Sequence, residues 1–165
     1  MSERAVEAPC VPFRAKILAE AIGIVYAEGP RHVTMRSLAE KLGYSAATIY
    51  LHFKNKEELF KEIALDGYDR LSATMEPSLA IDDPIAAVAD CAGRYIDFGL
   101  ENYPLYRLMF TDISPIERTP EEQARIMRSR DIAIELYRRG IERGVFRAAE
   151  LAFEAVIGWS LLHGF

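Results

Sequence analysis

The stretch of residues 34–60, TMRSLAEKLGYSAATIYLHFKNKEELF, most constrains what this chain can fold into. Two short helical segments are joined at Gly43, and a longer helix begins after Asn55. The second short segment carries hydroxyl groups, a tyrosine and a histidine and is followed by lysines, in a chain that is acidic overall. This order is typical of a helix-turn-helix, which places its second helix in the major groove of DNA.

The spacing of small and large side chains within this stretch has a steric cause. Ala39 lets two helices cross closely, Gly43 permits the turn, and Ile49 fills the space between the helices. The same spacing occurs in helical hairpins that bind nothing, so a packed hairpin without a ligand is the alternative at this point.

The outward face of residues 45–56 favours DNA over a bare hairpin. It opens with short side chains that let the backbone approach bases and phosphates, namely Ser45, Ala46, Ala47 and Thr48. Ala47 or the methyl group of Thr48 can contact a thymine methyl, and the hydroxyl groups can bond a base edge or a phosphate. Polar tips that reach phosphate oxygens follow at Tyr50, His52, Lys54 and Lys56. The alternatives are a half-buried Tyr50 and a solvated surface His52.

The segment from Arg14 to about Leu59 resembles the DNA-binding domain of tetracycline-repressor-like (TetR family) regulators. The matching positions are Ile17–Leu18, Ala21, Gly29, Thr34, Leu38–Ala39, Leu42–Gly43, Ser45, Thr48, Ile49–Tyr50, His52–Phe53, Lys54–Asn55–Lys56 and Leu59. The resemblance covers a little under a third of the chain. It implies an all-helical homodimer that binds a palindromic operator in double-stranded DNA and usually represses transcription.

The resemblance also implies residue roles. The Thr34 position and the region of Arg36 contact DNA from the second helix, and Lys56 touches a phosphate. The recognition helix uses the positions of Ser45, Ala46, Ala47, Thr48, Tyr50 and His52. Ala46 and Ala47 are small where relatives often carry a polar residue or glycine, so we expect few hydrogen bonds to bases. The operator sequence does not follow from these residues.

Charge and composition limit the compartment in which the protein can work and the partners that it can bind. The net charge is −5, yet residues 10–60 balance at +2 and residues 61–165 at −6, so only the N-terminal third attracts an anionic polymer. Cys10 and Cys91 give neither a disulfide framework nor metal-ligand spacing, and free thiols suit a reducing cytosol. The first residues do not form a secretory signal, and the longest apolar run, about 15 residues, is too short to cross a bilayer. We expect a cytoplasmic protein with no membrane partner.

Helical periodicity and end signals predict an all-α fold. The expected helices span 13–28, 35–42, 45–52, 56–75, 84–101, 104–112, 120–143 and 148 onward, with a loop at 76–83. Thr34, Ser45, Asn55, Asp83 and Thr119 are the expected N-caps. No alternating strand pattern competes.

Residues 61–165 carry no catalytic motif, so we expect no enzyme, metal or cofactor. Aromatic residues are concentrated in the middle of this part, and with Met109 they can line a ligand cavity: Tyr95, Phe98, Tyr103, Tyr106 and Phe110. A well-filled core is the alternative. Arg94 and Asp97 are expected to pair on the surface.

The last segment, from Ala148, is apolar nearly all round and must be buried on more than one side. Small residues permit a close two-fold contact, so we assign the dimer interface to Ala152, Ala155, Gly158 and Leu162. Trp159 and His163, followed by Gly164, resemble the W-x-x-x-H-G signature of one C-terminal subgroup of the family and are candidate ligand contacts. Alternatively, His163 is hydrogen-bonded in the core or the interface. Relatives usually carry one more helix after this one, so we expect either truncation after Phe165 or a disordered remainder.

The sequence therefore predicts an N-terminal three-helix helix-turn-helix DNA-binding domain at 10–57 and a helical bundle for ligand binding and dimerisation at 58–165. The expected function is a ligand-responsive repressor that binds DNA as a homodimer and is released by an unknown small-molecule effector. The alternative is an all-helical dimeric carrier of small molecules or lipids that binds no DNA. The sequence does not separate a repressor from an activator.

Overall fold

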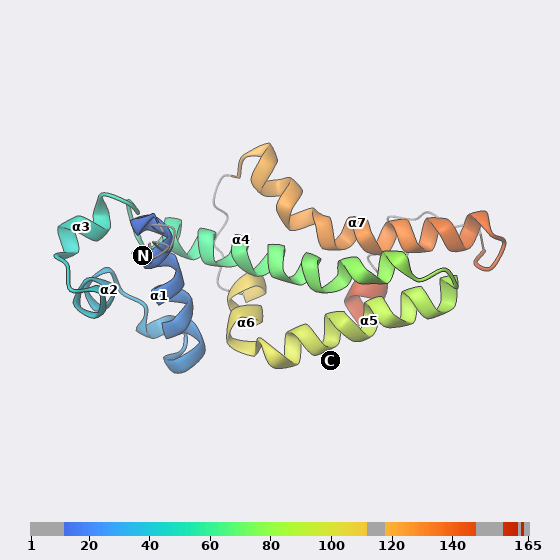
Figure 1. The fold of residues 1–165 in the computed structure, drawn as a ribbon, viewed down its shortest axis with the longest axis horizontal. Helices are drawn as coiled ribbons and strands as arrows, with labels where there is room; N and C mark the ends of the chain where they lie inside the picture. The colour runs from blue at the N-terminus through green and yellow to red at the C-terminus, as the bar shows by residue number, and fades with distance from the viewer. Residues whose placement is uncertain (1–11, 112–117, 148–156, 162, 164–165) are drawn as a thin grey trace, which may run out of the picture. The chain divides into compact units, whose positions relative to one another are not determined.

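The computed structural model describes residues 12–111, 118–147, 157–161 and 163. These residues are helices joined by turns, and no strand occurs among them, so the predicted all-α class is confirmed. The helices are α1 Phe13–Glu28, η1 Pro30–His32, α2 Met35–Leu42, α3 Ala46–Tyr50, α4 Lys56–Met75, η2 Glu76–Ala80, α5 Pro84–Glu101, α6 Tyr103–Thr111 and α7 Pro120–Glu142 (Figure 1). Residues 157–161 and 163 are also helical.

The chain divides into two compact units, Met1–Ile63 and Ala64–Phe165, and the division lies within α4. The compact first unit thus extends six residues beyond the boundary at 57 that the sequence suggested. The assignment of DNA binding to one part and ligand binding to the other stays a prediction.

Side-chain caps fix the helix starts that the sequence indicated. Thr34 and Ser37 form a capping box at α2, Asp83 accepts the N–H of Ala86 at 2.7 Å, and Thr119 forms a capping box at α7. At α4 the Asn55 side chain accepts the N–H of Glu58 at 2.8 Å. The Glu58 carboxylate accepts the N–H of Lys54 at 2.8 Å, one residue before the Asn55 cap, whereas a capping box would use the N–H of the cap residue itself.

The first unit packs α1, α2, α3 and the start of α4 around one apolar core. Its fully buried side chains include Ile17, Val25, Leu38, Ile49, Phe53 and Leu59. Gly43 ends α2 with φ 74°, the left-handed conformation that glycine adopts without strain, and so permits the turn into α3. The helix-turn-helix therefore rests on a core to which both of its helices contribute buried side chains.

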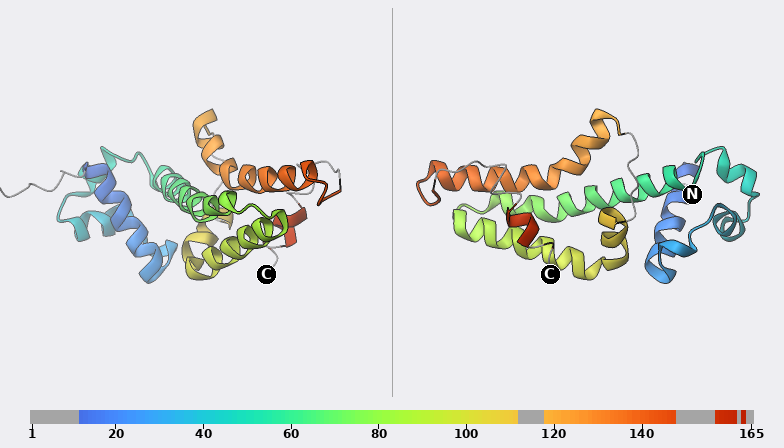
Figure 2. Two further views of the ribbon diagram at one scale, coloured as in Figure 1. Left: turned by 45° about the vertical axis from the view of Figure 1, so that its right-hand side comes forward. Right: turned by 180° about the vertical axis from the view of Figure 1, so that it is seen from behind.

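In the second unit the later part of α4 lies beside α5 and α7, and α6 turns back from the end of α5 (Figures 1 and 2). The Tyr68 hydroxyl donates to the Met109 carbonyl at 3.0 Å and so joins α4 to α6. At Gly67 a Cβ would lie 2.6 Å from the Met109 sulfur, so this glycine allows the close approach of α6.

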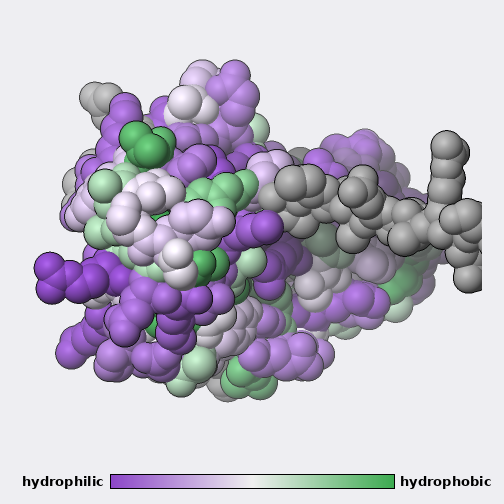
Figure 3. Space-filling view, turned by 60° about the vertical axis from the view of Figure 1, so that its left-hand side comes forward, coloured by the Kyte–Doolittle hydropathy of each residue, from purple (hydrophilic) through white to green (hydrophobic). Residues whose placement is uncertain are grey.

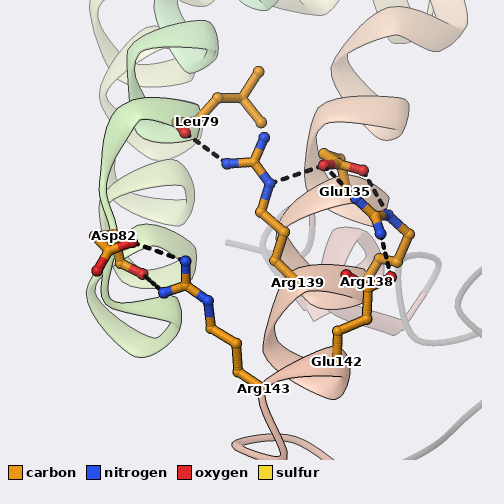
Figure 4. Close-up of polar contacts among 7 residues, drawn as sticks. All are labelled: Leu79, Asp82, Glu135, Arg138, Arg139, Glu142 and Arg143. Atoms are coloured by element: carbon orange, nitrogen blue, oxygen red, sulfur yellow. Dashed lines mark hydrogen bonds and ion pairs between the residues drawn. The ribbon is translucent and has the colours of Figure 1, made fainter.

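Arginines at the end of α7 and at its C-cap bond to the segment between α4 and α5. Arg139 donates to the Leu79 carbonyl at 2.7 Å and to Glu135 at 2.8 Å, and Arg143 pairs with Asp82 at 2.8 Å (Figure 4). Near the start of α7, Arg125 forms a bidentate ion pair with Asp69 of α4. The loop expected at 76–83 contains η2 and is fixed to α7 by these contacts.

Three local predictions were wrong or lie outside the described residues. Arg94 pairs with Asp90 at 2.6 Å, one turn before it, instead of with Asp97. Asp90 is half-buried and also accepts from buried Ser78, whereas Asp97 is exposed. α3 ends at Tyr50, and Leu51 and His52 form a turn. The start of the last helix at Ala148 lies outside the described residues. None of the described helices is long and apolar enough to span a membrane.

Candidate nucleic-acid interface and internal cavity

The start of α3 is organised by Ser45. Its hydroxyl oxygen accepts the N–H of Thr48 at 3.2 Å and lies 2.9 Å from the Thr48 hydroxyl oxygen. Ser45 is exposed, and Thr48 is half-buried. Both hydroxyl groups that were predicted to contact DNA thus take part in the helix cap. Their remaining lone pairs and the backbone at this helix start can still bond a partner.

The face of α3 opposite the core is apolar at its centre. Ile49 has no exposed surface, whereas Leu51 is 83% exposed and Tyr50 is 52% exposed. Ala47 is exposed one turn before Leu51, and Ala46 is half-buried. In the view that brings the α1–α3 end forward, the surface is mostly hydrophilic with small separate hydrophobic areas (Figure 3). An exposed leucine at the end of such a helix is a candidate contact that the sequence analysis missed.

An aromatic group supports the turn on either side of α3. The Phe13 ring lies 4.4 Å from the Tyr44 ring and 5.1 Å from the His52 ring, between ring centroids. His52 is half-buried by this packing and so differs from the fully solvated histidine of the alternative interpretation. Tyr44 is 53% exposed and was not among the predicted contacts.

The candidates before and after α3 are all accessible to some degree. Thr34 and Arg36 are exposed at the start of α2, and the Thr34 hydroxyl bonds Ser37 at 3.0 Å. Lys54 is exposed. Lys56 is half-buried, with its ammonium group 4.8 Å from the centroid of the Phe60 ring. The structure therefore brings the ten predicted DNA contacts to one compact unit.

The second unit contains a cavity of about 330 Å³. Its wall combines α4, α5, α6, α7 and the helical residues near 158, and it is lined by Tyr68, Met75, Val88, Cys91, Ala92, Tyr95, Phe110, Ile126, Met127, Ser129, Arg130, Ala133, Leu136, Tyr137, Gly158 and Trp159. Of the predicted ligand contacts, Tyr95, Phe110 and Trp159 lie on this wall.

The other predicted ligand contacts lie behind the wall or beside it. Phe98 and Met109 are buried in the core. Tyr106 bonds Tyr95 at 2.9 Å between hydroxyl oxygens, and His163 Nδ1 lies 2.5 Å from the Tyr106 hydroxyl. His163 also stacks on Trp159, with 4.6 Å between ring centroids. These contacts agree with the alternative in which His163 is hydrogen-bonded inside the protein.

One of the four predicted dimer contacts lies within the part of the chain that the structure describes. Ala152, Ala155 and Leu162 lie outside the described residues, and Gly158 lies on the cavity wall. A Cβ at Gly158 would lie 3.6 Å from the Tyr137 hydroxyl.

The α7 lining, from Ile126 to Tyr137, was absent from the sequence prediction because that helix is arginine-rich and resembles an exposed one. Its apolar positions recur at helical spacing in the sequence, at Ile126, Ala133 and Tyr137, and this period was the available signal. Among the described residues, no group of three or more His, Cys, Asp or Glu side chains is placed to hold a metal ion.

Comparison with known proteins identifies the architecture. Residues 17–63 match the sequence model described as bacterial regulatory proteins, tetR family, and residues 88–165 match the tetracycline repressor-like C-terminal domain. The crystal structure of PfmR, a TetR family transcriptional regulator from Thermus thermophilus, is 32% identical in sequence, with a TM-score of 0.71 over 90% of this chain and 83% of that chain. The chain belongs to the TetR family.

Other relatives extend this TetR family assignment. YobS of Bacillus subtilis, an uncharacterised HTH-type transcriptional regulator, is 24% identical over 95% of this chain and 79% of its own length. A Haemophilus influenzae HTH-type regulator is 41% identical, but over 49 residues, which are 26% of its length. A Rhodococcus protein of unknown function has the same fold, with a TM-score of 0.84 at 22% identity over 98% of this chain and 84% of that chain. The protein is thus a DNA-binding TetR family transcriptional regulator, and its membership of the W-x-x-x-H-G subgroup stays a prediction.

Proposed function

We propose that the protein is a ligand-responsive repressor that binds a palindromic operator as a homodimer. The observation that supports this proposal is the geometry of α3. This helix is capped by Ser45, anchored by buried Ile49 and exposed along its opposite face. A short, rigid helix with one face buried and the other open is the geometry that enters a major groove.

Within this proposal the contacts fall into two kinds. Arg36, Tyr50, Lys54 and Lys56 bind phosphates and position the protein without reading sequence. Ser45, Thr48 and the exposed pair Ala47 and Leu51 face base edges, where apolar side chains favour the methyl group of thymine. Most of the sequence information is then read through apolar contacts.

The cavity in the second unit supports the response to a ligand. Its lining side chains come from α4, α5, α6 and α7, so a bound molecule contacts several helices at once. A ligand that fits one arrangement of these helices better than another shifts the population toward that arrangement. Operator and ligand must then weaken each other's binding by the same factor.

The dimer rests on apolar surface in the second unit. Leu161 is 67% exposed and Ile157 is exposed on the helical residues 157–161. A second copy packed on this helix removes that surface from water. Chromosomal DNA as the partner places the protein in the cytoplasm, and this use requires no catalysis and no cofactor.

A selection from random DNA with the purified protein tests the proposal. We expect one palindromic sequence to be enriched and bound with an affinity that falls steeply as salt rises. Tyr50→Ala should weaken operator binding at least about tenfold, and Tyr103→Ala, which also removes an exposed tyrosine but from α6, should leave it unchanged. No enrichment would favour the dimeric carrier of small molecules or lipids, for which the cavity is the supporting observation.

A further inference from the structure

The cavity wall in the second unit exposes hydrocarbon to its interior from every helix that forms it. Aliphatic and thioether side chains come from α4, α5 and α7, and aromatic rings come from α6 and residue 159. A site of this kind gains binding energy mainly from apolar surface removed from water.

Two tyrosine hydroxyl groups at the wall already have partners inside the protein. Tyr68 donates to the Met109 carbonyl at 3.0 Å. The Tyr95 hydroxyl oxygen lies 2.9 Å from that of Tyr106 and 3.4 Å from His163 Nδ1. These groups need no hydrogen bond from a ligand, so an apolar occupant leaves neither of them unsatisfied.

The charge at the described part of the wall belongs to an ion pair. Arg130 is the cationic side chain among the described lining residues, and its guanidinium pairs with the Asp131 carboxylate at 3.0 Å. An anionic ligand must therefore compete with that carboxylate for Arg130. In the part of the wall that the structure describes, a cationic ligand meets no carboxylate.

Two further titratable groups at the wall remain uncharged at neutral pH. Burial raises the pKa of the Cys91 thiol to about 11, and burial raises the pKa of the Tyr95 hydroxyl as well. Neither group provides an ion for a charged ligand to pair with. A buried ion without a partner is disfavoured by several kcal/mol, so the site selects against charge.

The volume limits the size of the occupant. A dry apolar cavity of roughly 150 Å³ in another protein holds one benzene molecule. At about 330 Å³ this cavity is about twice as large. It therefore matches a molecule with two fused or linked six-membered rings, or an aliphatic molecule of the same bulk.

We propose that the effector is an uncharged, largely apolar molecule of about two rings, and that this cavity rejects an ionised molecule of the same shape. This inference rests on the proposed function, in which the cavity is the effector site. Selectivity arises from the absence of an available counter-ion among the described lining residues, and affinity arises from the hydrocarbon wall.

Isothermal titration calorimetry with two probes of one shape tests the inference. At pH 7, 2-naphthol is uncharged and 2-naphthoate is an anion. We expect 2-naphthol to bind the full chain at least about tenfold more tightly than 2-naphthoate, because the anion loses hydration that the wall does not replace. Equal or tighter binding of 2-naphthoate, or no binding of 2-naphthol, overturns the inference.

Matched variants test whether 2-naphthol binds in this cavity. Ala92→Leu fills the cavity from α5 and should weaken 2-naphthol binding at least about tenfold, whereas Ala89→Leu adds the same bulk at an exposed position one turn away. Ala133→Leu fills the cavity from α7 and repeats the test if Ala92→Leu lowers the melting temperature. Undiminished 2-naphthol binding in both cavity variants also overturns the inference.

Operator release is measured separately and distinguishes the two proposals. If 2-naphthol binds in the cavity but leaves operator affinity unchanged, coupling between ligand and DNA by this ligand is refuted, while the ligand class stands. If operator binding itself is absent, the repressor proposal fails and the calorimetric comparison still decides the ligand class.

Discussion

Leu51 lies one helical turn after Ala47, and both side chains are exposed on the same side of α3. Apolar side chains in a major groove can distinguish thymine by its methyl group. Replacing individual thymines of the selected operator with uracil, which lacks this methyl, should weaken wild-type binding at one position in each half-site. Leu51→Ala should weaken binding to the thymine operator by about 1 kcal/mol and abolish the thymine–uracil difference at that position, as measured by gel shift. A thymine–uracil difference that persists in the variant would assign the methyl contact to another residue.

The lysine after α3 leads to a prediction about salt. Lys54 is exposed and is proposed to neutralise one phosphate. Lys54→Ala should reduce the slope of log affinity against log salt concentration by about 1 for each protomer, and it should do so equally on specific and random DNA. Arg147→Ala removes an exposed cation from the second unit and serves as the control. An unchanged slope for Lys54→Ala would mean that this lysine touches no phosphate.

Substitutions of Tyr50 and Phe53 distinguish a residue that contacts DNA from a residue that packs in the core. Tyr50 is 52% exposed, so Tyr50→Ala should leave the free energy of unfolding within about 0.5 kcal/mol of wild type. Phe53 is fully buried, and Phe53→Ala should cost about 3–5 kcal/mol. Chemical denaturation of both variants provides the measurement. A large loss of stability in Tyr50→Ala would support the packing role for this tyrosine.

Several helix ends in both units could be predicted from the sequence. The caps at Thr34, Ser45 and Asp83 and the turn at Gly43 follow from local chemistry, since each needs only neighbouring residues. The exposure of Leu51 could not be predicted, because an apolar residue at the end of a short helix is as compatible with a core as with an exposed face. The cavity was predicted only on its α5 and α6 side and at Trp159, because no local pattern tells which face of α7 turns inward.

Glu135 of α7 makes the stability of the protein depend on pH. Hydrogen bonds from Arg138, and then from Arg139, lower the pKa of this carboxyl to about 2 from its usual 4.5. The folded state thus binds the proton less readily than the unfolded state, so the contribution to stability is complete above pH 4.5 and is lost as pH falls toward 2. Glu135→Gln should flatten the decline of melting temperature across this range, whereas Glu101→Gln should leave it unchanged. A wild-type pH profile in Glu135→Gln would contradict the assignment.

Two glycines within helices are expected to respond in opposite directions. Gly67→Ala forces the Met109 side chain or α6 to move and should destabilise the protein by about 1–3 kcal/mol. Gly23 of α1 has open space where a Cβ would lie, so Gly23→Ala should stabilise the protein by roughly 0.5–1 kcal/mol. Thermal unfolding of both variants is the measurement, and equal shifts would contradict the close contact between α4 and α6.

The chain contains a single tryptophan, and Trp159 belongs to the cavity wall. Its emission therefore comes from one known place, next to the space that an effector would fill, with no second indole elsewhere to mask a change. The unlabelled protein thus carries its own optical reporter of occupancy, and collections of non-absorbing compounds can be screened against it directly, before any operator has been found.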